Sequence, residues 1–285
     1  MILACVFAFF CFRTGLPDIG GNYFTGHGRY YDDLVVTNLD VGKADCAVLQ
    51  YRDTVGIIDT GTEEAGDTIE AFLKDNNIDS FDYMILTHYD KDHIGSAVRL
   101  LEDYGTDMIY IPDYVSKKKY YEGLMEELGE HENVVTVSAE PVTFTYDDLE
   151  MSIIPADDPA PLLEDEKNCD NNMSLVCMAD FGSNRLLFTG DIEGDRISQM
   201  LETGTDMDAD WIKIPHHGAY EKEVKDLLDA VTPVDSVIST SHEREPDEKL
   251  LKALEKRGIN NYDTMTGNIV TICDGENMKI TEVQP

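Results

Sequence analysis

The segment from Leu86 to Gly95 (LTHYDKDHIG) carries four side chains that could bind a metal ion. They are two histidines and two aspartates within six consecutive positions, namely His88, Asp90, Asp92 and His93. Imidazole nitrogen and carboxylate oxygen are the usual protein ligands of zinc and similar divalent ions. A polar loop that only caps a helix needs one acid, not two acids and two histidines. The segment therefore predicts a metal site.

Three further segments place groups of the same kind where an apolar run ends. They are IDTG with Asp59, LFTGD with Asp191, and IKIPHHG with His216 and His217. Each alone could be an ordinary turn, because Asp and Gly favour turns. Their recurrence is informative, since α/β architectures assemble sites from loops at one edge of the sheet. We therefore expect one metal centre built from His88, Asp90, Asp92, His93, Asp191, His216 and His217.

Alternating strands and helices must position these groups. In the first half, strands are predicted at 34–39, 46–51, 55–59, 83–87, 108–111, 134–137, 142–145 and 149–154, and helices at 65–76, 94–104 and 117–128. Residues 155–170, rich in proline and acidic residues, interrupt this pattern. In the second half, strands are predicted at 174–181, 185–189, 211–215, 236–240, 269–273 and 278–283, and helices at 193–202, 221–230 and 247–256. The two halves predict two sheets sandwiched between helix layers, forming one domain at 34–285.

Residues 1–33 are expected to be a separate apolar segment and linker. Residues Met1 to Phe12 are wholly apolar, but twelve residues are too few to cross a bilayer and no basic residue precedes them. Two interpretations stay open. The segment is either the remnant of an export signal or membrane anchor, which we slightly favour, or an element packed into the fold of a cytoplasmic protein.

The charge of the chain limits its partners. Its 285 residues include 22 Lys+Arg and 57 Asp+Glu, which gives a net charge of −35. Such a surface repels nucleic-acid phosphates and anionic lipids, so no stable nucleic-acid partner is expected. Solubility alone also explains an acidic surface. The six cysteines show no CxxC pair or zinc-ribbon spacing, and a disulfide framework is not expected.

The order IDTG, THYDKDH, TGD and PHHG resembles the metallo-β-lactamase superfamily. Within it, the chain is similar to the branch that contains the hydrolase domain of bacterial DNA-uptake (competence) channel proteins. Matches to this branch are LDVGKAD at 39–45, NNMSLV at 171–176 and Pro246 before a helix. The resemblance covers about Leu34 to Glu282. It implies an αββα four-layer sandwich of two mixed β-sheets flanked by helices.

The resemblance also implies roles for the site residues. His88, Asp90, Asp92 and His93 would bind metal, Asp191 would bridge two ions, and either His216 or His217 would complete the second site. Asp59 would hold the His88 loop by hydrogen bonds without touching metal. The chain departs from the family at Asp90, where histidine is usual, and near Asn171-Asn172, where another ligand histidine is usual. One or two Zn²⁺ ions are expected, with Mn²⁺ as an alternative at the site poorer in nitrogen.

The function expected from these features is that of a metal-dependent hydrolase that uses a metal-bound hydroxide on a phosphodiester or related ester. Asp92 would orient the nucleophile, and His242, or His217 if His216 is the ligand, would protonate the leaving group. The substrate would be a small molecule or a nucleic acid, for which Lys117–Lys119 would supply a local basic rim or would simply begin a helix. β-Lactam cleavage is not expected from this ligand set. The alternative is a metal-binding sensor or binding protein of the same fold without turnover, which a hydrolysis assay on the metal-loaded protein would separate from the enzyme.

Overall fold

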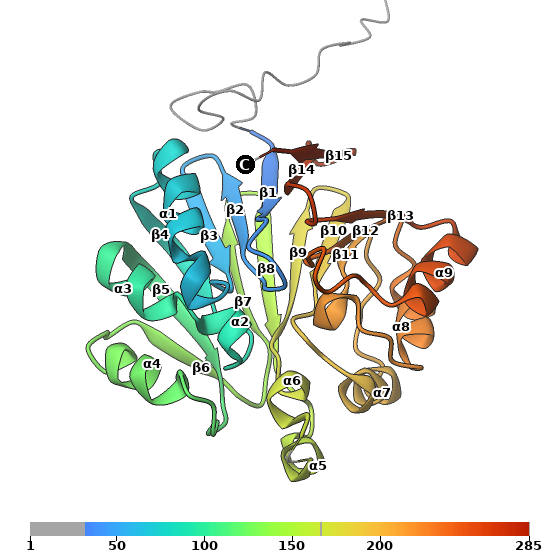
Figure 1. Cartoon of the computed structure of the whole chain (residues 1–285), viewed down its shortest axis with the longest axis horizontal. Helices are drawn as coiled ribbons and strands as arrows, with labels where there is room; N and C mark the ends of the chain where they lie inside the picture. Colours follow the sequence, from blue (N-terminus) through green and yellow to red (C-terminus); the bar gives the residue numbers. More distant parts are fainter. Residues whose placement is uncertain (1–31, 166, 285) are drawn as a thin grey trace, which may run out of the picture.

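The computed structural model describes residues 32–165 and 167–284. The predicted export signal or anchor at residues 1–12 and most of the linker after it lie outside this part of the chain. Two mixed β-sheets form the centre of the described part, and helices cover the outer face of each (Figure 1). This arrangement confirms the predicted αββα sandwich.

The first sheet holds eight strands, in which β3 to β6 run parallel and the remaining neighbours are antiparallel. In spatial order the strands are β15 (Met278–Val283), β14 (Asn268–Cys273), β1 (Leu34–Asn38), β2 (Ala47–Tyr51), β3 (Thr54–Ile58), β4 (Ser80–Ile85), β5 (Gly105–Pro112) and β6 (Val134–Val137). The residues that end β3 and β4 are buried and apolar, as expected for parallel strands covered on both faces.

The second sheet holds seven strands, in which β10 to β13 run parallel and β7 to β10 antiparallel. In spatial order they are β13 (Asn260–Asp263), β12 (Asp235–Ile238), β11 (Trp211–Lys213), β10 (Asn184–Phe188), β9 (Val176–Phe181), β8 (Leu149–Ile154) and β7 (Val142–Tyr146).

The helices form the two outer layers and the connections at the site. The first sheet is covered by α1 (Gly66–Asp75), α3 (Ala97–Asp103) and α4 (Tyr121–Leu128), and the second by α7 (Gly194–Thr203), α8 (Val224–Val231) and α9 (Glu248–Arg257) (Figure 1). Shorter pieces are η1 (Glu63–Ala65), α2 (Lys91–Ile94), α5 (Pro159–Glu164), α6 (Cys169–Asn172) and η2 (Pro215–Gly218). None of the helices in the described part is long and apolar enough to span a bilayer.

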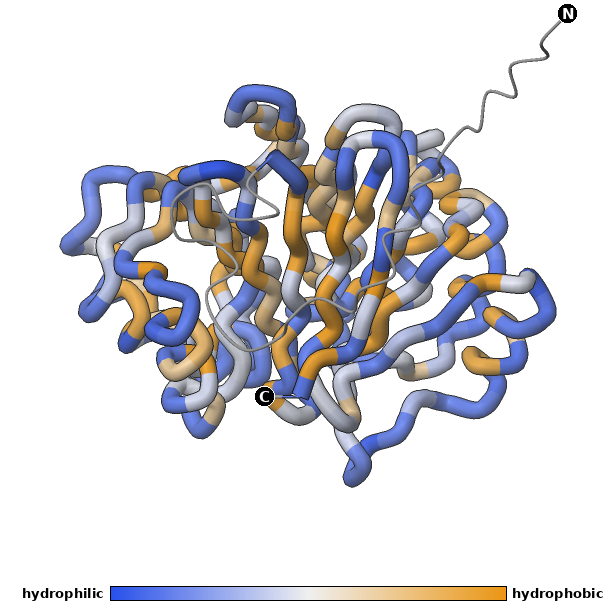
Figure 2. The backbone as a smooth tube through the Cα atoms, turned by 90° about the horizontal axis from the view of Figure 1, so that it is seen from above, coloured by the Kyte–Doolittle hydropathy of each residue, from blue (hydrophilic) through white to orange (hydrophobic). Residues whose placement is uncertain are grey.

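Three main apolar clusters hold the layers together. One lies between the two sheets and includes Trp211 and Tyr83, and the other two lie between each sheet and its helices. Figure 2 shows the same division, with apolar residues on the central strands and hydrophilic residues on the outer loops and helices. Cys46 and Cys177 are buried free thiols.

Three predicted elements need correction. The single helix predicted at 94–104 is split into α2 and α3, because Gly95 lies against the backbone of Thr62 and Glu63 and donates a hydrogen bond to Gly61. The predicted break at 155–170 contains α5, which begins where the Asp158 side chain accepts from the amide of Ala160. β13, a polar strand that pairs with β12, carries no apolar pattern and was not predicted.

Candidate metal centre

The site residues sit on the loops that follow parallel strands of both sheets. His88 follows β4 and His93 lies on α2, whereas Asp191 follows β10 and His217 lies in η2 after β11. The amide of Leu175 donates to the carbonyl oxygen of Thr87 at 2.9 Å and joins the two sheets beside these loops. The fold therefore brings residues that are more than a hundred positions apart to one edge of the sandwich.

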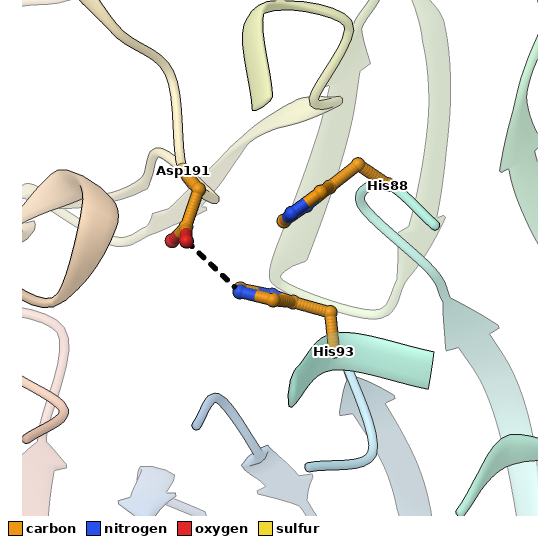
Figure 3. Close-up of side chains that lie close together, drawn as sticks. All are labelled: His88, His93 and Asp191. Atoms are coloured by element: carbon orange, nitrogen blue, oxygen red, sulfur yellow. Dashed lines mark ion pairs between the residues drawn. The ribbon is translucent and has the colours of Figure 1, made fainter. Parts of the chain in front are cut away.

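Five of the predicted ligands converge at this edge. Asp191 Oδ2 lies 3.2 Å from His93 Nε2 and 3.2 Å from His217 Nε2, and His217 Nε2 lies 3.5 Å from Asp92 Oδ2. Figure 3 shows the side chains of His88, His93 and Asp191 pointing toward one another. The ligand atoms of that trio lie within 4.8 Å of one another, as do those of the trio Asp92, His93 and His217.

Their donor atoms fit a divalent ion. Within the described residues, Nε2 of His88 is buried without a hydrogen-bond partner, and Nε2 of His93 and of His217 form no aligned hydrogen bond although Asp191 Oδ2 lies 3.2 Å from each. A buried polar group left without a partner costs about 1–3 kcal/mol, which a bound ligand would offset. A set of imidazole nitrogens and carboxylate oxygens suits zinc and related first-row ions.

Asp59 holds the loop that carries His88, and the ring of His93, by hydrogen bonds. Its carboxylate accepts hydrogen bonds from the amide and the hydroxyl of Thr87, both at 2.8 Å, and lies 2.7 Å from His93 Nδ1. Because Nδ1 faces Asp59, Nε2 of the same ring faces the pocket. The predicted hydrogen bonds between Asp59 and the His88 loop are thereby confirmed.

The pKa values of the histidines at the centre are shifted in different directions. Burial lowers the pKa of His88 well below its ordinary value, so this imidazole is neutral at pH 7. Burial alone would also lower the pKa of His93, but the carboxylates of Asp191 and Asp59 outweigh it and raise that pKa. Burial opposes ionisation of Asp191 as well, yet His217 and His93 bring its pKa well below the ordinary value. Opposite charges thus favour one another in this cluster, and a bound ion would take the place of the proton on each ring.

His216 and His217 point in different directions, which decides between them. Both residues have a positive φ, 50° and 52° respectively, inside a tight turn. His217 is buried, and its Nδ1 lies 3.0 Å from the carbonyl oxygen of Ser239. The His216 side chain is 27% exposed, and its Nδ1 lies 3.1 Å from Glu193 Oε1. Of the two alternatives left open by the sequence, the structure brings His217 and not His216 into the close donor groups of the described residues.

Asp90 also lies apart from the converging donors. Its two carboxylate oxygens are 2.8 Å and 3.0 Å from the ammonium of Lys118, and it belongs to none of the close donor groups of the described residues. The expectation that Asp90 binds metal is therefore not supported by the geometry, since a lysine already neutralises it.

The asparagines near the usual position of another ligand have structural partners. Asn171 donates to Glu193 at 2.8 Å, and Asn172 Oδ1 accepts from the amides of Glu193 and Arg196 at the start of α7. His242, the expected proton donor, is exposed in the turn after β12 and makes no contact with the centre in the described structure. Neither asparagine therefore adds a ligand, and His242 does not contact the centre.

Two charged residues at the centre were missed. Asp45 ends the LDVGKAD motif and Lys213 ends β11, and both side chains are buried and in contact with each other. A signal for Lys213 was present, because a lysine inside the apolar run Trp211–Ile214 must find a buried partner. Lys43, from the same motif, lies 3.6 Å from Asp92 Oδ2 with its side chain 30% exposed.

Comparison with known proteins supplies a family. Residues 39–242 match the family described as "Metallo-beta-lactamase superfamily". ComE operon protein 3 of Bacillus subtilis is 28% identical over 192 residues, which make up 66% of this chain and 24% of that protein. Recombination protein 2 of Haemophilus influenzae is 28% identical over 211 residues, which make up 72% of this chain and 24% of that protein. The chain thus matches about a quarter of the length of each of these relatives.

Solved structures share the fold at low identity. CmlA, a diiron β-hydroxylase from Streptomyces venezuelae, has a TM-score of 0.54 and 14% identity, over 88% of this chain and 54% of that chain. A likeness at this identity concerns the fold alone.

Proposed function

The chain belongs to the metallo-beta-lactamase superfamily, and from this premise we propose that it is a metal-dependent hydrolase of a phosphodiester or related ester. The observation that carries the proposal is the convergence of three buried imidazole Nε2 atoms, on His88, His93 and His217, around the Asp191 carboxylate. Asp92, His93, Asp191 and His217 would hold a divalent ion, with His88 Nε2 beside them. Zn²⁺ suits this mixed set of imidazole nitrogens and carboxylate oxygens, and Mn²⁺ is the alternative.

The ion and the residues of the pocket would have separate roles in the proposed reaction. A divalent ion held by these residues would activate water for attack near neutral pH and would polarise the ester oxygen. Although burial raises the pKa of Asp92, His217 and His93 outweigh burial and bring it well below the ordinary value. Asp92 therefore stays a carboxylate, accepts a hydrogen bond from the attacking water and orients it.

The position of Lys43 favours a substrate that carries negative charge. Its ammonium lies beside Asp92 at the edge of the pocket and is partly exposed, so it can contact a phosphoryl oxygen as charge develops there. His242 is left out of the proposal because its side chain is exposed and belongs to none of the close donor groups of the described residues.

Two substrate classes remain for the experiment to separate. Similarity to a recombination protein makes nucleic acid a candidate substrate, whereas the net charge of −35 favours a small phosphodiester. No stable nucleic-acid complex is proposed. An association of the N-terminal segment with a membrane remains a sequence-based expectation.

Metal analysis combined with a substrate panel tests the proposal. The purified protein would be assayed for zinc, manganese and iron, and then offered a generic phosphodiester, single- and double-stranded nucleic acid, and a thioester. We expect bound metal and chelator-sensitive cleavage of a phosphodiester, with cleavage lost in His217→Ala. Bound metal without turnover on any member of the panel would favour the sensor. A protein that binds no divalent ion would overturn the metal-dependent proposal.

A further inference from the structure

A buried ion pair lies directly behind the proposed metal centre. The Lys213 ammonium contacts Asp45 Oδ2, and the side chains are 5% and 8% exposed. The surrounding space is lined largely by apolar groups, among them Ala47, Ile58 and Phe188. Since two charges lose their hydration on burial, a pair of this kind often adds little to folding stability compared with apolar residues. Its contacts suggest another role.

The pair lies within 4 Å of three of the four proposed ligands. Asp45 Oδ2 lies 3.8 Å from His93 Nδ1, and Asp45 Oδ1 lies 3.7 Å from His217 Nδ1. Lys213 Nζ lies 3.8 Å from Asp191 Oδ1, the oxygen that does not face the two histidines. The pair thus lies next to both imidazole rings and next to the carboxylate between them.

The two partners come from different sheets. Lys213 ends β11 of the second sheet, whereas Asp45 lies on the loop between β1 and β2 of the first sheet. The amide of Asp45 donates to the Asp92 carbonyl oxygen at 3.0 Å, and its own carbonyl accepts from Gly61 at 2.8 Å. Asp45 is therefore fixed to the helix that carries Asp92 and His93. Lys213 is fixed to the strand that leads to His217.

We propose that the Asp45–Lys213 pair is a positioning device that sets the spacing between the ligands of the first sheet and those of the second. The inference rests on the metal centre of the proposed function. Without the pair, Asp191 loses its contact with Lys213, and each histidine keeps only its other Nδ1 partner, Asp59 for His93 and the Ser239 carbonyl for His217. The donor atoms would then reach one ion less well, although each of them is still present.

A double variant separates positioning from folding. In Asp45→Asn or Lys213→Met alone, the remaining partner is a buried unpaired charge, and we expect both stability and zinc affinity to fall. The double variant D45N/K213M removes one charge of each sign, so the net charge beside the centre is unchanged. We expect its apo form to unfold at nearly the same denaturant concentration as the wild type. Its zinc affinity, measured by chelator competition, should be about 10–100-fold weaker.

A spectroscopic readout and a matched pair complete the test. The cobalt(II)-loaded double variant should show a changed visible absorption spectrum, which a purely structural role would not produce. The pair Asp229–Arg257, 2.7 Å apart, joins the outer helices α8 and α9 and is the control, with Asp229 exposed and Arg257 partly buried. D229N/R257M should leave affinity and spectrum unchanged. If D45N/K213M does not fold, Asp45→Glu keeps the charge but shifts the carboxylate, and its zinc affinity should fall.

The outcomes distinguish this inference from the proposed function. Wild-type zinc affinity and cobalt spectrum in D45N/K213M, or in Asp45→Glu where only that variant folds, would overturn the positioning role and leave the metal centre intact. A wild-type protein that binds no zinc at all would overturn the centre, and the inference with it.

Discussion

At the residue scale, the sharpest feature is the divergence of two adjacent histidines. The positive φ of both residues turns the backbone so that His217 points into the pocket and His216 points toward Glu193. Such values are uncommon for residues with a side chain and persist only where the surroundings enforce them. The turn therefore serves to present one imidazole to the centre.

The first prediction follows from this turn. His217→Ala removes a donor, so metal affinity should fall by more than the roughly 10–100-fold caused by losing a group that only orients a ligand. His216→Ala should leave the affinity unchanged, and the two variants form a matched pair one residue apart. Chelator competition measures both. Equal losses in the two variants would show that His216 also binds the ion.

Asp59 carries the second prediction. Asp59→Ala keeps every proposed ligand but frees His93 Nδ1 and leaves the Thr87 amide without its acceptor. We expect metal affinity to weaken by about 10–100-fold and the free energy of unfolding of the apo protein to fall by about 1–3 kcal/mol. Chelator competition and denaturant titration give the two values. Unchanged metal content would show that His93 does not depend on Asp59.

The third prediction concerns Asp90 and Lys118. Because Lys118 neutralises Asp90, Lys118→Ala should free an oxygen donor two residues from His88 and strengthen binding of a second ion, especially Mn²⁺. Asp90→His should raise zinc occupancy in the same position. Metal content per chain after saturation and gel filtration is the measurement, with Lys119→Ala as the control. A single ion per chain in all these variants would contradict the prediction.

The residue types in the sequence predicted which side chains are candidate metal donors, but not which other side chains contact those donors. His88, His93, Asp92 and Asp191 were readable because each stands next to a strand end with few structural reasons to be there. The choice of His217, the neutralisation of Asp90 and the burial of Asp45 depend on backbone angles and long-range contacts. Those contacts form only when the two sheets meet, so local sequence does not contain them.

At the element scale, the parallel strands were predictable because continuous apolar runs indicate burial on both faces. The polar strand β13 was not, because its pairing with β12 rather than any apolar pattern makes it a strand. α5 carried a recognisable start at Asp158-Pro159, hidden by the acidic and proline-rich composition around it. Elements defined by tertiary pairing are thus the ones that pattern alone misses.

The fourth prediction tests the packing that holds β3 against β4. A Cβ built on Gly56 would overlap the ring of Tyr83, its partner across the two strands. Tyr83 is fully buried and packed between Phe144 and Tyr146, so the ring has little room to move. Gly56→Ala should lower the free energy of unfolding by about 1–3 kcal/mol, as overpacking does.

Gly105→Ala is the matched control in the same sheet. A Cβ at Gly105 meets only Ser80 Cβ at 3.7 Å, an ordinary contact on an exposed position. Denaturant unfolding of both variants should show a loss for Gly56→Ala alone. Equal stability of the two variants would mean that Tyr83 can shift without cost.

At the scale of the whole molecule, an acidic surface surrounds a centre with cations close by. The chain has a net charge of −35, yet Lys43, Lys118 and Lys213 each lie within 4 Å of a carboxylate at or beside the site. Long-range repulsion of an anionic substrate and short-range attraction at the pocket therefore act against each other. Which of the two dominates depends on the size of the substrate and on ionic strength.

The last prediction uses this competition to identify the substrate class. A long polyanion feels the charge of the whole surface, whereas a small monoanionic phosphodiester mainly feels the pocket. Between about 20 mM and about 200 mM salt, the Debye length falls from above 10 Å to below 10 Å, which screens the surface more than close contacts. For a single-stranded oligonucleotide, kcat/KM should therefore rise with salt, opposite to the fall seen for basic nucleic-acid-binding proteins. For the small phosphodiester it should change little. A fall in kcat/KM for the oligonucleotide would show that a basic rim around Lys117–Lys119 and Lys43 outweighs the overall charge, and that the site is shaped to draw nucleic acid in.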